Sequence, residues 1–244
     1  MNFTTKIVNW YSKNKRDLPW RINKNPYSVW LSEIILQQTK IQQGLPYYLR
    51  FMDKYPNVFS LSQASEQDIL KLWEGLGYYS RARNLLKTAK LIVRDSDGVF
   101  PSTYTGLLKL PGIGKYTASA ISSICYEERK AVLDGNVFRL LSRYFNIDYP
   151  INSPLGLKYF EQLSFDLLPK NNIGDYNQAL MDFGSTVCKP KLAKCDTCIL
   201  KEECGAYANS KIYLVPVKTK KKPAVIKYFN FLIYISNDNK TIIE

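Results

Sequence analysis

The sequence predicts an all-α fold over most of its length, and two observations lead to this prediction. Apolar residues recur with the i, i+3, i+4, i+7 spacing of amphipathic helices up to about residue 185. Strong hairpin signals are missing from the same region. Beyond residue 185 the helical pattern ends, and the sequence continues with a cluster of cysteines, a lysine-rich stretch and a short apolar run of β type.

The first helices can be placed from their start signals. Asn25 and Pro26 are typical of an N-cap followed by a first-turn proline. Ser65, with Asp68 three residues later, resembles a capping box, and Gly75 is suited to end that helix. The helix behind Pro26 is expected to carry the apolar residues Trp30, Leu31, Ile34, Ile35, Leu36 and Ile41.

The later helices follow from apolar repeats and end signals. Ser153 and Pro154 open one helix, and Gly184 is expected to follow the end of another. The repeats that define these helices are Ala82, Leu85, Leu86, Ala89, Ile92 and Val93; Ala118, Ile121, Ser122 and Cys125; and Tyr176, Leu180 and Phe183. Cys125 falls within its apolar repeat, which favours core packing over chemistry.

The composition is that of a basic globular protein. With 34 Lys and Arg against 21 Asp and Glu, the 244 residues carry a formal net charge of +13, and there is no histidine. This charge favours a polyanionic partner, most simply nucleic acid, although solubility alone would also account for it. Neither a secretory signal nor a bilayer-spanning apolar run is evident. We expect a monomeric, cytoplasmic protein with reduced thiols and no membrane partner.

Four cysteines, Cys188, Cys195, Cys198 and Cys204, form a compact C-x6-C-x2-C-x5-C motif. Because the chain contains no histidine, a metal site here would be all-thiolate. The spacing favours an iron–sulfur cluster, which we expect to be [4Fe-4S]. A four-thiolate zinc site usually shows two C-x2-C pairs and is the alternative, together with unligated thiols.

The segment from Leu110 to Lys115 reads Leu-Pro-Gly-Ile-Gly-Lys and joins two predicted helices. Gly112 and Gly114 would let backbone N–H groups and the N-terminus of the next helix approach a phosphate. An ordinary helix connection could have this sequence, but beside the net charge it favours a DNA-backbone contact. Together with Asp-Gly-Asn-Val at 134–137 and the cysteine motif, this hairpin resembles the endonuclease III superfamily of DNA glycosylases.

The resemblance narrows to the MutY-type adenine DNA glycosylases, over roughly residues 5 to 235. It rests on Trp-Leu-Ser-Glu at 30–33, Leu-Gln-Gln-Thr at 36–39, Gly-Leu-Gly-Tyr-Tyr-Ser-Arg-Ala-Arg-Asn at 75–84 and Leu-Asp-Gly-Asn-Val at 133–137. It implies base-excision repair of double-stranded DNA, in which adenine mispaired with 8-oxoguanine or guanine is flipped out and its N-glycosidic bond is hydrolysed.

The resemblance also implies a helix-hairpin-helix glycosylase fold of two helical subdomains. Residues 20–130 are expected to form a six-helix subdomain with the hairpin, and residues 1–19 with 131–210 a subdomain that holds the cluster. The cluster is expected to dock DNA rather than to catalyse hydrolysis.

A basic linker is expected at 211–227, before a short β-type tail at 228–244. The run from Tyr228 to Ile235 resembles the first strand of the Nudix-like domain that recognises 8-oxoguanine in the family. Because most of that domain is missing from the 244 residues, we expect the preference for 8-oxoguanine over guanine to be weaker than in longer relatives.

Tyr116 stands where endonuclease III relatives carry a catalytic lysine, two residues after the last glycine of the hairpin. Lys115 is adjacent, but one helical residue turns it away by about 100°. The resemblance therefore implies a monofunctional glycosylase without lyase activity.

Glu33 and Asp134 are the candidate catalytic carboxylates. A glutamate on an amphipathic helix is usually solvated, but the helix around Glu33 is apolar nearly all round, so we expect burial to raise its pKa. The resemblance assigns it to protonate adenine and then to activate water. Asp134 has the signature of an N-cap, which keeps a carboxylate ionised, and the resemblance gives it the role of stabilising the sugar cation. Asn136 lies in the same turn as Asp134 and is a further candidate catalytic residue.

The resemblance assigns five further residues to the flipped nucleotide. Gln38 and Tyr78 would wedge into the vacated stack. Trp20, Arg21 and Gln178 would surround the extruded base, since an amide can pair with an adenine edge. Core packing for Trp20 and a solvated helix face for Gln178 are the simpler interpretations.

The loop between the first two cysteines carries Lys189, Lys191 and Lys194, which are suited to contact phosphates. Two other functions stay open. One is a thymine–guanine mismatch glycosylase, because such relatives can also carry tyrosine at the Tyr116 position. The other is a non-catalytic, cluster-bearing DNA-binding module, which the presence of Glu33 and Asp134 disfavours.

Overall fold

The computed structural model describes residues 2–219 together with 228, 235 and 238, and the elements of this part are all helices. The all-α prediction is therefore confirmed for the described residues. In chain order the elements are α1 (Phe3–Asn14), η1 (Pro19–Arg21), α2 (Pro26–Leu36), α3 (Ile41–Lys54), α4 (Val58–Ser62), α5 (Glu66–Trp73), α6 (Ser80–Ser96), α7 (Tyr104–Leu107), α8 (Lys115–Tyr126), α9 (Gly135–Tyr144), α10 (Pro154–Asp166), α11 (Ile173–Thr186), η2 (Lys201–Glu203) and α12 (Gly205–Ala208). Among them, none has both the length and the apolar character that a membrane span requires.

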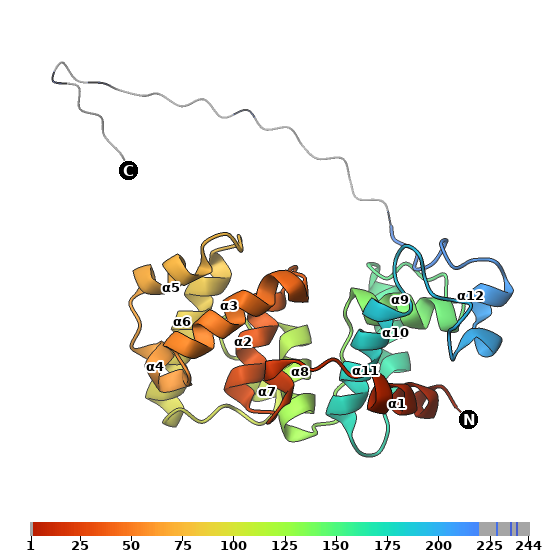
Figure 1. The fold of residues 1–244 in the computed structure, drawn as a ribbon, viewed down its shortest axis with the longest axis horizontal. Helices are drawn as coiled ribbons and strands as arrows, with labels where there is room; N and C mark the ends of the chain where they lie inside the picture. The colour runs from red at the N-terminus through yellow and green to blue at the C-terminus, as the bar shows by residue number, and fades with distance from the viewer. Residues whose placement is uncertain (1, 220–227, 229–234, 236–237, 239–244) are drawn as a thin grey trace.

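The helices surround two large hydrophobic cores, and a small third cluster consists of Ala206, Ile212 and Val215. In Figure 1, α2 to α7 gather at one end of the molecule, and α1 with α9 to α12 at the other. The first core uses side chains between Leu18 and Val132, contributed by η1 and by α2 to α8. The second combines α1 with side chains between Val137 and Leu200. Helix α1 packs against α11 although the two are far apart in the sequence. The division into folding domains at the expected boundaries stays a prediction.

The predicted helix starts are confirmed by their hydrogen bonds. The Asn25 side chain accepts from the backbone N–H groups of Tyr27 and Ser28 at the start of α2. Ser65 accepts from the N–H of Asp68 and so caps α5. Because each cap satisfies N–H groups that have no partner within the helix, these starts are fixed locally by the sequence.

The structure corrects the extent of the helix that was predicted to follow Pro26. Helix α2 ends at Leu36, and Ile41 opens α3 after a turn in which Gln38 has φ +56°. The apolar repeat runs across this break because Ile41 packs against the same core. The range 20–130 contains the seven α-helices α2 to α8, of which α4 and α7 are short.

Gly184 was expected to follow a helix, but α11 continues to Thr186. A Cβ atom at Gly184 would lie 2.7 Å from Cβ of Asn136 and 2.8 Å from its carbonyl oxygen. The glycine therefore allows α11 to approach the start of α9. It serves close packing and not helix termination.

The predicted β-type tail lies outside the described residues apart from Tyr228, Ile235 and Asp238, and so does the second part of the predicted linker, residues 220–227. Before it, residues 217–219 run beside the segment that precedes α10. The N–H of Ile151 donates to the carbonyl of Val217 at 3.0 Å, and the N–H of Thr219 donates to the Asn152 side chain at 2.8 Å.

Candidate active site

Glu33 lies on α2, where this helix packs against α8. Burial raises the pKa of its carboxyl group from 4.5 to about 7. A hydrogen bond with Tyr116 and the positive charge of Arg21 act in the opposite direction, whereas the negative charge of Asp134 adds to the increase. At neutral pH a large fraction of this carboxyl group therefore carries a proton that it can donate.

Tyr116 occupies the second position of α8 and faces inward. Its hydroxyl contacts the sulfur of Met181 at 3.3 Å and hydrogen-bonds with Glu33. Burial and the charge of Glu33 raise the pKa of this phenol well above 10, so it stays a neutral donor. Lys115 points elsewhere: its side chain is 81% exposed and its Nζ lies 3.8 Å from Oε1 of Glu161. No amine thus replaces the lyase lysine at this position.

Asp134 is the N-cap of α9, as the sequence indicated. Its Oδ1 accepts from the N–H groups of Asn136 and Val137, each at 2.8 Å, and its Oδ2 accepts from Nδ2 of Asn136 at 2.6 Å. Burial nevertheless raises the pKa of Asp134, against these hydrogen bonds and the charge of Arg139. Burial therefore acts on Asp134 as it does on Glu33, but the cap hydrogen bonds and the charge of Arg139 favour the ionised form of Asp134.

Arg139 supports the turn of Asp134 and was not identified from the sequence. It is 8% exposed, and its Nη2 donates to Oδ1 of Asn136 at 2.9 Å. The same side chain donates from Nη2 to the carbonyl of Gly184 at 2.6 Å and from Nε to that of Cys188 at 2.8 Å. One guanidinium group therefore connects the catalytic turn to the first cysteine.

The residues assigned to the base differ in their surroundings. Trp20 is 6% exposed and packs edge-on against Tyr48 with 4.9 Å between ring centroids, as a core residue would. Gln178 is 4% exposed, so a solvated helix face is excluded. Its amide makes no hydrogen bond with the described residues. It lies three residues before Met181 on α11, hence on the face that meets Tyr116.

Arg21 is held by a buried carboxylate, Asp182. Its Nη1 and Nη2 donate to the two oxygens of Asp182 at 2.8 and 2.9 Å, and Arg16 pairs with the same group. Burial would raise the pKa of Asp182, but the hydrogen bonds and charges of the two arginines lower it. The Nε atom of Arg21 is buried without a partner in the described part of the chain. This arginine keeps one donor free.

Gln38 and Tyr78 lie on two exposed turns. Both have positive φ, at +56° and +49°, and the Tyr78 side chain projects with 67% of its surface exposed. Non-glycine residues avoid this backbone region, so both turns are held by their surroundings.

The hairpin ends at the N-terminus of α8. Gly112 has φ +76°, and a Cβ atom there would lie 2.8 Å from Cβ of Asn84. Gly114, the N-cap, has open space around it, and no side chain caps the helix. The first N–H groups of α8 are thus available to an anion. Leu110 belongs to the preceding turn, where its carbonyl accepts from the N–H of Ile113 at 3.2 Å.

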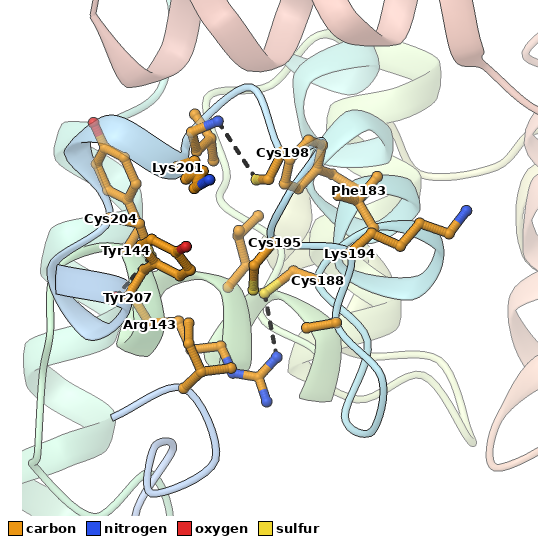
Figure 2. Close-up of a pocket in the computed structure, with 15 residues that line it drawn as sticks. Arg143, Tyr144, Phe183, Cys188, Lys194, Cys195, Cys198, Lys201, Cys204 and Tyr207 are labelled. Carbon is orange, nitrogen blue, oxygen red and sulfur yellow. Dashed lines mark hydrogen bonds between the residues drawn. The ribbon is translucent and has the colours of Figure 1, made fainter. Parts of the chain in front are cut away.

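The four cysteines line one cavity beside α9 and α11. Figure 2 shows them around this space, with Nη1 of Arg143 at 3.5 Å from Sγ of Cys188. Arg143 is 2% exposed and also donates to the carbonyl of Lys189 at 2.7 Å. Lys201 lines the same cavity. Of the loop lysines, Lys191 and Lys194 are exposed and Lys189 is half-buried.

The cysteine cavity can be tested against the two metal groups that the sequence left open. Within the described residues, no three Cys, Asp or Glu side chains are arranged to hold a single metal ion. All four thiols line one cavity, which suits a cluster held by four thiolates. The cations of Arg143 and Lys201 would offset thiolate charge.

Comparison with known proteins agrees with this geometry. Residues 31–154 match the family described as HhH-GPD superfamily base excision DNA repair protein. An adenine DNA glycosylase from Buchnera aphidicola subsp. Baizongia pistaciae is 40% identical over 99% of this chain and 69% of its own length. An adenine DNA glycosylase from Mus musculus is 40% identical over 84% of this chain and 42% of its own length. The chain belongs to the HhH-GPD superfamily and, within it, to the adenine DNA glycosylase family.

Two solved structures resemble this family member. A thermostable thymine-DNA glycosylase superposes with a TM-score of 0.77 and 30% identity, covering 85% of this chain and 95% of the other. A non-covalent endonuclease III–DNA complex gives a TM-score of 0.72 at 19% identity, covering 85% of this chain and 94% of that one. At that identity the second likeness supports the fold alone.

The sequence did not identify the residues that support the candidate active site and the cysteine loop. Arg139 and Arg143 are spaced four apart on α9, which would usually mark a solvated face. Asp182 lies in an apolar repeat with no sequence sign of its two arginine partners. Each is a long-range contact, so the sequence pattern around it carries no signal.

Proposed function

We propose that the chain hydrolyses the N-glycosidic bond of adenine opposite 8-oxoguanine or guanine in double-stranded DNA, without a lyase step. One observation carries this proposal. Glu33, with a pKa of about 7, lies beside a neutral Tyr116 and in electrostatic contact with Asp134. A protonated acid, an anion and no amine nucleophile are what hydrolysis without a Schiff base requires.

In this mechanism, Glu33 donates its proton to a ring nitrogen of the extruded adenine. The bond from C1′ of the sugar to the base breaks, and the sugar becomes an oxocarbenium-like cation. Asp134 stabilises that cation as an anion fixed by Asn136 and the N–H of Val137. Water then attacks C1′ and returns a proton to the Glu33 carboxylate, which restores the acid.

Adenine recognition would use buried side chains around the site. Gln178 is 4% exposed, and its amide would pair with a base edge. Nε of Arg21 is a buried donor without a partner among the described residues. Trp20 would contribute a wall of the pocket from the first core.

DNA binding would use the first N–H groups of α8, which have no side-chain cap. Lys191 and Lys194 are exposed on the cysteine loop and would contact backbone phosphates. Lys115 would have to leave its long contact with Glu161 to join them.

The substrate and the reaction type can be tested on matched duplexes with A opposite 8-oxoguanine, A opposite guanine and T opposite guanine. We expect adenine release from the first two, with strand breaks only after alkali, because Tyr116 cannot form a Schiff base. Covalent trapping by borohydride in stoichiometric yield would contradict the monofunctional mechanism. Release of thymine in preference to adenine would favour the reaction named for the thymine-DNA glycosylase to which the fold is similar.

We also propose that Cys188, Cys195, Cys198 and Cys204 hold one [4Fe-4S] cluster, which would brace the loop that carries Lys191 and Lys194. All four are free thiols that line the same cavity. When bound, the cluster supplies structural cross-linking of this loop and not acid–base chemistry. The hydrolytic steps belong to Glu33 and Asp134.

The cluster proposal predicts about four irons per chain and a brown colour in anaerobically purified protein. Cys198→Ser should lose most of the iron. Cys125→Ser is the matched control and should keep it, because burial raises the pKa of this core thiol to about 12. Stoichiometric zinc without iron, or equal iron loss in both variants, would overturn the assignment.

A further inference from the structure

One side chain, Arg81, connects the two exposed turns that carry Gln38 and Tyr78. It lies in the first turn of α6 and is partly buried. Its guanidinium donates to five backbone carbonyl oxygens, which are those of Ile34 at 2.9 Å, Ile35 at 3.1 Å, Gln37 at 2.8 Å, Leu76 at 3.3 Å and Gly77 at 3.3 Å. These bonds come from Nη1 and Nη2 alone, so four N–H groups of the planar fork are shared among the five acceptors, and Nε is buried without a partner in the described part of the chain.

The first three acceptors belong to the C-terminal end of α2 and the turn behind it. The last carbonyls of a helix have no partner within the helix, and a positive charge is favourable at that end. Arg81 supplies both the donors and the charge. These carbonyls lie one to four residues beyond Glu33, so Arg81 also restrains the end of the helix that carries the acid.

The other two acceptors belong to the turn before Tyr78. There the carbonyl of Gly77 also accepts from Nε1 of Trp73 at 3.0 Å. The guanidinium carbon of Arg81 lies 5.0 Å from the centre of the Trp73 ring, a cation–π distance. Since Trp73 is fully buried, this turn is anchored to the core through the same pair of side chains.

Both turns hold a non-glycine residue at positive φ, Gln38 at +56° and Tyr78 at +49°. Such a conformation persists only where the surroundings fix it. Arg81 is the group that the two turns share. Without it, each turn would be free to relax independently, and the spacing between the two exposed side chains would no longer be set.

We propose that Arg81 is a positioning residue that fixes these turns against each other and against the Glu33 helix, so that Gln38 and Tyr78 enter the DNA stack in a single register. This inference rests on the proposed function, since it concerns extrusion of the same nucleotide. The geometry assigns Arg81 to the extrusion step and not to the chemistry, because its Nη1 and Nη2 atoms donate to backbone carbonyls and its Nε is buried without a partner among the described residues.

The test uses the full chain with Arg81→Met and Arg81→Lys. Lysine keeps the charge but lacks the fork that reaches both turns. Arg94→Met is the matched control, because Arg94 lies on the same helix and pairs only with its neighbour Asp95 at the surface.

Three quantities are measured: the melting temperature, the fluorescence of 2-aminopurine placed at the target adenine as a readout of extrusion, and the single-turnover rate of adenine release. The release rate is compared for adenine opposite guanine and adenine opposite an abasic site, where extrusion requires less unstacking.

We expect Arg81→Met to lower release from the A:G duplex by about 10²-fold, the usual effect of a misplacement of about 1 Å. The defect should shrink at least about tenfold opposite the abasic site, and the 2-aminopurine signal should fall in parallel. Arg81→Lys should lie between Arg81→Met and the wild type, and Arg94→Met should match the wild type. An equal loss on both duplexes with unchanged 2-aminopurine fluorescence would overturn the proposal, and so would no loss at all. If the wild type and Arg94→Met release no adenine, the proposed function fails. In that case the 2-aminopurine fluorescence of the Arg81 variants still tests whether Arg81 positions the two turns for extrusion.

Discussion

Glu33→Gln is expected to abolish adenine release while leaving duplex binding intact. Glutamine cannot donate the proton that the leaving base requires, and loss of a general acid typically lowers a rate by about 10²- to 10⁴-fold. The measurement is single-turnover excision from an A:G duplex, with binding followed separately. Glu66→Gln changes the charge equally at an exposed ion pair and should excise normally. Excision by Glu33→Gln at a rate near that of the wild type would place the acid elsewhere.

The same substitution should stabilise the fold at neutral and alkaline pH. The pKa of Glu33 is about 7 in the folded state against 4.5 ordinarily, so folding favours its protonated form. Its contribution to stability is fully present below about pH 4.5 and is lost as the pH rises to about 7 and beyond. Glutamine is neutral throughout and avoids this loss, which is about 3 kcal/mol at most. Equal unfolding free energies for the two proteins at pH 8 would contradict a desolvated Glu33.

Asp134→Asn is expected to lower the single-turnover rate by about 10²- to 10³-fold, the usual loss when one electrostatic stabiliser of a transition state is removed. The amide oxygen can still accept from the N–H groups of Asn136 and Val137, so the helix cap is kept. The measurement is excision from the same A:G duplex. A rate within about tenfold of the wild type would show that the anion at this position is dispensable.

The structure also indicates how much stability Asp134→Asn should lose. Oδ2 of Asp134 accepts from Nδ2 of Asn136 at 2.6 Å, and an amide nitrogen there would face another donor. Loss of one hydrogen bond lowers the free energy of unfolding by about 1 kcal/mol, far too little to explain the rate. Asp166→Asn is the control, since it removes an exposed carboxylate that accepts one hydrogen bond from Gln162. Unfolding of Asp134→Asn at the assay temperature would remove its value as a mechanistic variant.

The sequence predicted what is encoded locally. The caps at Asn25 and Ser65 depend on neighbouring residues only, so they could be assigned before the structure. The raised pKa of Glu33 was also predictable, because the residues around it on α2 are apolar on nearly every face.

What the sequence could not supply was the set of contacts between distant segments. Asp182 gains its two arginines from residues 16 and 21, and Arg139 reaches Cys188 across 49 positions. Gly184 looked like a helix terminator because its clash partner, Asn136, lies on another helix. The burial that raises the pKa of Asp134 could not be predicted for the same reason, since desolvation depends on the whole fold.

The pH dependence of single-turnover adenine release tests the central claim most directly, that Glu33 is a general acid with a pKa raised by burial. Between pH 7 and 9 the wild-type rate should fall by roughly fiftyfold in total, approaching about tenfold per unit above pH 8, as the proton leaves Glu33. The residual rate of Glu33→Gln should be flat over the same range, whereas Glu66→Gln should follow the wild type. A wild-type rate that stays constant or rises between pH 7 and 9 would contradict the assignment of Glu33 as the acid.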